Sequence, residues 1–231
     1  MKIIDYITSI SKIIYGGSAI LYASIMCGID SKNELKYRKK VSKILTNLIA
    51  SEVIIEGEID KSAQLLIGNH THNLDISLME SIFDEKLYWV AKKELGDIPI
   101  IKYMVTKSDM ILIDRNNKRS IIQMIKEVKK RIDNGEKVVI FPEGTRNKKN
   151  PKKMLPWKKG IKALGEKLNP KIQPFVIINL PYAFEGKFLI KKVPIKVIFL
   201  DSFYPEEKPN WFEETRAKMQ EILDKEYNNE N

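Results

Sequence analysis

Residues 64–84, QLLIGNHTHNLDISLMESIFD, contain a short apolar run, a polar turn and an apolar pattern of helical period in direct succession. The apolar run has the length of a strand and ends at Asn69. A helix is predicted from about Leu74, with Asn73 as its N-cap. A strand followed closely by a helix is the unit from which α/β proteins with parallel sheets are built. This stretch therefore predicts an α/β fold.

The same alternation continues along the chain on both sides of this stretch. Further strands are predicted, from their length and β-branched content, at residues 52–57, 87–91, 110–114, 137–143, 172–180 and 193–201. Further helices are predicted at residues 120–135, 158–168 and 211–227. The predicted fold class is α/β, with a central, largely parallel or mixed sheet flanked by helices.

Composition limits the class of protein. The 231 residues are 43% hydrophobic, which is enough for a real core, and carry a formal charge of +10 with a pI near 9.4. Such a charge favours an anionic partner, namely nucleic acid, a phospholipid surface or a phosphorylated substrate. Cys27 is the only cysteine, which excludes a disulfide framework and a thiolate metal cluster.

The N-terminal part of the sequence predicts contact with a membrane. Residues 13–29 hold no charge, and residues 35–50 form a basic amphipathic pattern suited to anionic lipid. Three interpretations of residues 13–29 stay open: a helix that dips into one leaflet, a membrane span and a buried core helix. We therefore divide the chain into N-terminal membrane-associating helices at 1–50 and a catalytic domain at 51–231.

Both histidines of the chain, His70 and His72, follow the strand that ends at Asn69. Open α/β sheets bind ligands at this end of their strands. A sharp turn there would bring Asp75 to His70, fix the imidazole tautomer and leave the other ring nitrogen as a general base.

The histidine pair has three alternatives to a general base. The histidines can be incidental residues of a capped turn. A zinc or iron site would need further strong ligands, and the sequence has no third histidine to supply one. A serine nucleophile would need a motif such as GxSxG, which is absent from the sequence. A general base without a protein nucleophile is the sharpest interpretation.

Two arginines follow other predicted strands. Arg115 ends ILIDR, and Arg146 ends FPEGTR, in which Gly144 allows close backbone approach. A guanidinium can donate two hydrogen bonds to one phosphate. Both arginines can equally be solvated surface residues, but their shared position at strand ends favours a phosphate site.

Residues 146–162 carry eight basic and no acidic side chains. Met154, Leu155 and Trp157 lie between these charges, a pattern that suits nucleic acid, a membrane interface or a solvated loop. The apolar N-terminal segment favours lipid and argues against nucleic acid as the partner.

These motifs together resemble the glycerolipid acyltransferase family, best known for its lysophosphatidic acid acyltransferases. NHTHNLD resembles the NHxxxxD block, ILIDR the second, FPEGTR the third and IQPFVI the fourth, in the same order, and WVAKKELGDIPII resembles a lysine-rich segment between the first two. The resemblance covers about residues 50 to 205. His72 is a departure, because the family more often has another polar or small residue there.

The resemblance implies acyl transfer from a thioester, acyl-CoA or acyl carrier protein, to the hydroxyl of lysophosphatidic acid, with no resident cofactor and no metal. It implies that His70 is the base and that Asp75 orients it. The acceptor's phosphate would be held by Arg146, Arg115 and Lys93, in a loop shaped by Glu143, Gly144 and Thr145. The enzyme would act at the cytoplasmic face of the cell membrane. The alternative acceptors are another lyso-lipid and glycerol 3-phosphate. The alternative function is a non-catalytic module that binds lipid or nucleic acid.

Overall fold

The computed structural model describes residues 3–114, 117, 119–186 and 188–228. In this part of the chain, one sheet has seven strands in the order β1-β9-β6-β2-β5-β3-β4. Their bounds are β1 (Ala50–Glu56), β2 (Leu65–Gly68), β3 (Leu87–Lys92), β4 (Ile111–Ile113), β5 (Lys137–Ile140), β6 (Ile172–Ile178) and β9 (Val193–Phe199). Neighbouring strands are parallel except β6 and β9, which are antiparallel. The predicted α/β class is confirmed.

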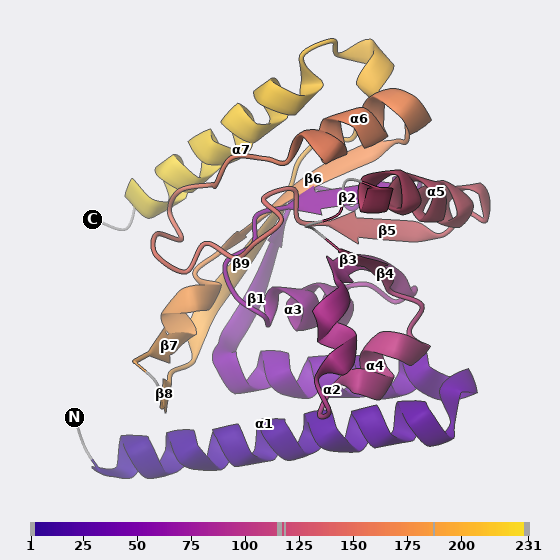
Figure 1. Ribbon diagram of the computed structural model, residues 1–231. Coiled ribbons are helices and arrows are strands. Elements are labelled where there is room, and N and C mark those ends of the chain that lie inside the picture. The colour runs from indigo at the N-terminus through magenta and orange to yellow at the C-terminus, as the bar shows by residue number, and fades with distance from the viewer. Residues whose placement is uncertain (1–2, 115–116, 118, 187, 229–231) are drawn as a thin grey trace.

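Helices cover both faces of the sheet (Figure 1). The α-helices are α1 (Ile3–Ile29), α2 (Glu34–Ile49), α3 (Asp75–Ile82), α4 (Lys102–Lys107), α5 (Arg119–Asp133), α6 (Lys159–Leu168) and α7 (Trp211–Asn228). Short 3-10 helices are η1 (Ser31–Asn33), η2 (Lys93–Asp97), η3 (Leu180–Ala183) and η4 (Pro205–Glu207), and β7 (Phe184–Glu185) pairs with β8 (Leu189–Ile190) in a small hairpin. The sequence had not predicted α4 or this hairpin.

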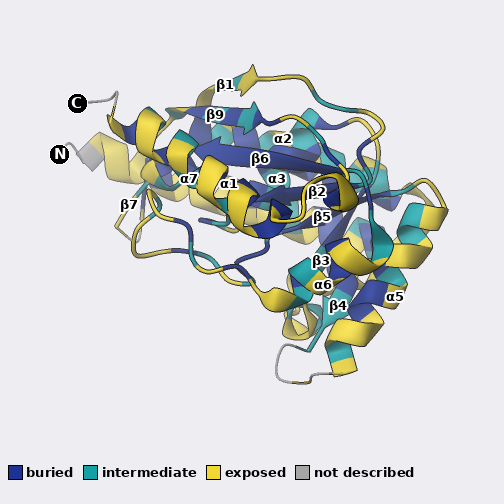
Figure 2. Ribbon diagram, turned by 90° about the horizontal axis from the view of Figure 1, so that it is seen from above, coloured by how far each residue is buried: buried dark blue, intermediate teal, exposed yellow. Residues whose placement is uncertain are grey.

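The alternation of side chains along the central strands divides the core in two. Leu65 and Ile67 of β2 point to the face covered by α5, α6 and α7, whereas Leu66 points to the face covered by α2 and α3. All three are fully buried, and every residue of β6 is buried as well. Figure 2 shows β2 and β6 in the buried colour between the two helical layers. β2 is a central strand, with β5 on one side and β6 on the other, so the turn that follows it lies at the middle of the sheet.

The N-terminal helix α1 lies along the body of the protein, against α2, α4 and β8 (Figure 1). It begins at Ile3, ten residues before the predicted apolar segment, and therefore includes Lys12, whose side chain donates to the carbonyl of Ile190 at 3.1 Å. Gly16 allows close packing, since a Cβ there would lie 3.2 Å from Leu45 and Leu48. Its apolar window is only 22% buried, so the interpretation as a buried core helix is wrong.

The helix predicted at residues 35–50 is present as α2, and its contact with lipid stays a prediction, because Lys36, Lys40 and Lys43 are exposed. It lies between α1 and α3, and Arg38 is 1% exposed in an ion pair with Glu80 of α3 and another with Glu34 at 3.3 Å. Sequence reasoning missed these buried partners. α2 ends at Ile49 and β1 begins at Ala50, the residue at which the N-terminal helices were expected to end.

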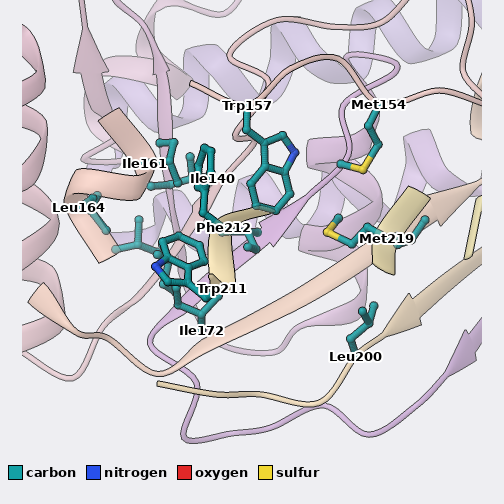
Figure 3. Packing of buried hydrophobic residues seen from close by; sticks show 14 of the residues in the cluster. Ile140, Met154, Trp157, Ile161, Leu164, Ile172, Leu200, Trp211, Phe212 and Met219 are labelled. Carbon is teal, nitrogen blue, oxygen red and sulfur yellow. The ribbon is translucent and has the colours of Figure 1, made fainter. Parts of the chain in front are cut away.

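The basic stretch after β5 also differs from its prediction. Met154 and Trp157, which had been assigned to a membrane interface or to stacking on bases, are both 6% exposed and pack in the core with Phe212 and Met219 of α7 (Figure 3). The Trp157 and Phe212 rings meet edge to face with centroids 5.3 Å apart. These apolar side chains hold the stretch against the protein, and most of its lysines are exposed.

Candidate active site

The turn between β2 and α3 brings His70 and Asp75 together. Oδ2 of Asp75 lies 2.8 Å from Nδ1 of His70, and it accepts the backbone N–H groups of Thr71 and His72 at 2.8 and 2.9 Å. Asp75 is completely buried and is the first residue of α3, where the helix dipole favours a negative charge. The hydroxyl of Thr71 donates to the other oxygen, Oδ1, at 3.4 Å, so four donors and the helix terminus fix the carboxylate.

The environment of His70 leaves one ring nitrogen available. Because Nδ1 faces the carboxylate, its proton stays on Nδ1 and the Nε2 lone pair is free to accept another. The ring stacks on Phe141 with centroids 4.0 Å apart and an interplanar angle of 1°. Its side chain keeps 15% exposure, so a substrate can reach it. This is the geometry of a general base.

His72 has a different environment. Its Nδ1 accepts the N–H of Leu74 at 3.3 Å, and its ring stacks on Phe184 of β7 with centroids 4.1 Å apart. Burial, the largest effect, lowers the pKa of His72, and the positive charge of Arg146 lowers it further. His72 is therefore a neutral ring that packs on the hairpin, and only its backbone supports Asp75.

The loop after β5 supports the turn between β2 and α3. Glu143 is 1% exposed and accepts the N–H of His70 at 2.9 Å and that of Leu155 at 2.8 Å. Burial raises the pKa of Glu143 to about 7, against the effect of these two hydrogen bonds. Gly144 has φ +65°, and a Cβ there would lie 3.2 Å from Lys158. Glu143 thus holds the backbone at His70, and Gly144 lets the loop turn.

The candidate phosphate ligands lie at the same edge of the sheet. Arg146 is half-buried, close enough to His72 to affect its pKa, and has no ion-pair partner among the described residues. Thr145 is exposed beside it. Lys93 is exposed and directly follows β3, which is separated from β2 by β5. Arg115 lies outside the described residues.

A cavity of about 440 Å³ is lined in part by Phe141, whose ring stacks on that of His70. Gly144 and Lys158 line it as well, and the rest of the lining is mostly apolar and comes from β3, β4, β5, α5, α6 and the loops after β4 and β5. These lining residues are Val90, Ile113, Asp114, Ser120, Ile121, Met124, Ile140, Pro142, Thr145, Gly160 and Ile161. The cavity was not predicted, because in the sequence its apolar residues cannot be distinguished from residues of the hydrophobic core.

Two asparagines of the site were also missed. The side chain of Asn69 accepts the N–H of Ile177 at 2.7 Å and donates to its carbonyl at 2.9 Å, which extends the pairing of β2 with β6 up to the histidine. The backbone N–H of Asn147 donates to the carbonyl of His70 at 2.8 Å. The signal for Asn69 was its place directly before His70, whereas Asn147 gave none.

Known proteins resemble this chain along most of its length. A family model described as Acyltransferase matches residues 32–178. The 1-acyl-sn-glycerol-3-phosphate acyltransferase of Helicobacter pylori is 40% identical over 173 residues, covering 74% of this chain and 73% of that protein. The protein of the same name from Cocos nucifera is 29% identical over 181 residues, 77% of this chain, but this chain spans only 57% of its length.

A solved structure shows the same fold. The crystal structure of the 1-acyl-sn-glycerophosphate (LPA) acyltransferase, PlsC, from Thermotoga maritima superimposes with a TM-score of 0.69, covering 97% of this chain and 96% of that one at 21% identity.

Proposed function

The chain belongs to the acyltransferase family, and we propose that it moves a fatty acyl group from a thioester donor to the free hydroxyl of lysophosphatidic acid, giving phosphatidic acid. The observation that carries the proposal is the His70–Asp75 pair, at 2.8 Å, with a free Nε2 and an unpaired arginine close by. A base and a phosphate ligand at one sheet edge are what this acceptor needs.

The chemistry follows from the protonation state of His70. Its Nε2 takes the proton of the acceptor hydroxyl as the oxygen attacks the thioester carbonyl, and the imidazolium then gives this proton to the departing thiolate. Asp75 stabilises the imidazolium and keeps the ring in position, and no covalent acyl-enzyme is needed. A base placed in this way contributes roughly 10² to 10⁴ in rate.

We assign the acceptor's phosphate to Arg146, with Lys93 and Arg115 as further ligands. Arg146 has no carboxylate partner among the described residues, so its donors are available for a phosphate. Glu143 takes no direct part, because both of its oxygens bind backbone N–H groups. We assign an acyl chain to the apolar cavity beside Phe141, which touches the base through its ring.

We also propose that α1 lies in the plane of a membrane, on its cytoplasmic face. It is long and apolar enough to cross a membrane, but it packs along the protein body instead of projecting from it. Its large exposed apolar side chains are Ile4, Tyr6, Ile7, Ile10, Ile13, Ile14, Tyr15, Leu21, Tyr22, Ile25 and Ile29. On its inner side, α1 and α2 pack against Leu74, which directly precedes Asp75. A lipid acceptor held at α1 is thus close to the base.

Release of thiol from an acyl thioester, measured with purified protein and vesicles, tests this function. We expect release only when lysophosphatidic acid is present, with phosphatidic acid formed in equal amount and with no loss of rate in a strong chelator. A monoacylglycerol, which has the hydroxyl but lacks the phosphate, is the matched control and should react poorly. Release that occurs only with another lyso-lipid, or only with glycerol 3-phosphate, would assign that molecule as the acceptor. If no acceptor supports release, enzymatic acyl transfer is refuted.

A further inference from the structure

The segment after Arg146 presents a group of lysines that the proposed chemistry does not use. Their side chains are exposed and form no ion pair with any described residue, and no acidic residue occurs between positions 144 and 165. We call them the lysine platform: Lys148, Lys149, Lys152, Lys153, Lys158 and Lys159.

The backbone of the platform is held firmly. Gln220 of α7 accepts the N–H of Met154 at 2.8 Å and donates to the carbonyl of Lys152 at 2.9 Å. Arg216 of α7 donates to the carbonyls of Met154 and Leu155, both at 3.3 Å. Like charges repel, and a mobile loop would let them separate. A backbone that is held in place keeps these charges together on one segment, which favours an anionic ligand there.

The platform is also joined directly to the candidate active site. Asn147, which precedes it, bonds the carbonyl of His70, and the N–H of Lys158 donates to the carbonyl of Pro142 at 2.9 Å. Lys158 also lines the cavity beside Phe141. A group bound on the platform would therefore be next to the base.

The platform lies away from the proposed membrane surface. It packs on α7, which covers one face of the sheet, whereas α1 packs on α2, over the opposite face. Figure 1 shows α7 and α1 on opposite sides of the molecule. With α1 in a bilayer, the lysines face the aqueous phase, which argues against lipid headgroups as their ligand.

We propose that the lysine platform is the docking surface for an acidic carrier protein that presents the acyl thioester. This inference rests on the proposed function and identifies its donor. Lys158 lines the cavity beside Phe141, and the other five lysines are exposed along residues 148–159. A charged surface of this breadth suits a protein of opposite charge. Attack on the thioester carbonyl forms the new ester, breaks the C–S bond and leaves the thiol on the carrier.

The test compares two donors that carry the same acyl chain, one on an acidic carrier protein and one on CoA. The variant is Lys148→Glu, Lys149→Glu, Lys152→Glu and Lys153→Glu together, which leaves Lys158 and the site intact. The matched control reverses four other lysines that are exposed and unpaired among the described residues, Lys61, Lys126, Lys130 and Lys167.

We expect kcat/KM for the carrier-bound donor to fall by about 10-fold or more in the platform variant, and that for the CoA donor by about 3-fold or less, since charge complementarity acts mainly on association of the large partner. The control should keep both rates, and vesicle binding should not change. Equal losses with both donors, no use of the carrier-bound donor by the parent protein, or weaker vesicle binding would each overturn the inference. Activity with the CoA donor alone would still leave the proposed function standing.

Discussion

Nδ1 of His70 lies 2.8 Å from Oδ2 of Asp75, and the same oxygen accepts the backbone N–H groups of the two residues that follow His70. The carboxylate thus holds both the ring and the backbone of the turn. The two histidines of the chain have separate partners, because His72 stacks on Phe184 and does not bond Asp75 through its ring.

This difference predicts unequal effects of removing the histidines. His70→Ala should lower kcat by at least about 100-fold, because the base is lost. His72→Ala should keep most of the activity, since its backbone N–H remains. Steady-state rates with lysophosphatidic acid measure both variants, and equal losses would refute the assignment of His70 as the base.

Asp75→Asn should also lower kcat severely, because the orienting charge is lost. Circular dichroism should show that the variant keeps its fold.

The buried carboxylate of Glu143 predicts a dependence of stability on pH. Its pKa is raised by burial from an ordinary 4.5 to about 7, so the folded protein binds this proton more tightly than the unfolded chain does. The free energy of unfolding therefore receives a contribution that is complete below about pH 4.5 and is lost as the pH rises toward 7. Glu143→Gln removes this contribution.

Melting temperatures of the parent and the Glu143→Gln variant, measured from pH 4.5 to 8, test this expectation. Other carboxylates affect both proteins alike, so the difference between the two curves isolates Glu143. We expect the variant to lose less stability than the parent over this range. Parallel curves would show that Glu143 titrates as an ordinary exposed carboxyl group.

The parts of the fold that follow local rules were predictable from sequence. β2 is a short apolar run, β5 and β6 are rich in β-branched residues, and polar residues separate β2 from α3. The antiparallel direction of β9 had no such signal, because the pairing of distant strands is decided by packing. The same holds for the hairpin of β7 and β8, two residues in each strand.

The site was predictable only where its residues are neighbours in sequence. His70 and Asp75 are five positions apart, so the turn could be inferred. The contacts of Glu143 with His70 and Leu155 join separate loops, and the exposed pattern of residues 146–162 concealed the burial of Met154. Charge and apolar content indicate whether a side chain prefers to be buried or exposed, but they do not show which distant element will cover it.

The exposed face of α1 predicts where the protein meets lipid. Ile7 and Ile14 are 63% and 65% exposed and lie two turns apart on this helix. Replacing both by Glu should remove most binding to anionic vesicles in co-sedimentation, because charge there is costly to place in the interface. The matched control places Glu at Ile55 and Ile122, exposed apolar positions on β1 and α5. Undiminished binding of the α1 variant would show that another surface holds the lipid.

Arg146 allows the acceptor site to be tested apart from the base. A guanidinium donates two parallel hydrogen bonds to a phosphate, whereas a lysine offers a point charge on a flexible stem. Arg146→Lys therefore keeps the charge and loses the geometry. We expect KM for lysophosphatidic acid to rise markedly, KM for the thioester to change little, and kcat to fall only as far as the hydroxyl is misplaced relative to Nε2 of His70.

The control for this variant is Lys167→Arg, which makes the reverse exchange on an exposed side chain of α6 outside the lysine platform and should leave both KM values unchanged. A rise in KM for the thioester in place of the acceptor would move Arg146 to the donor site. The phosphate would then belong to Lys93 or Arg115, and the corresponding variants of those residues would have to show the acceptor defect.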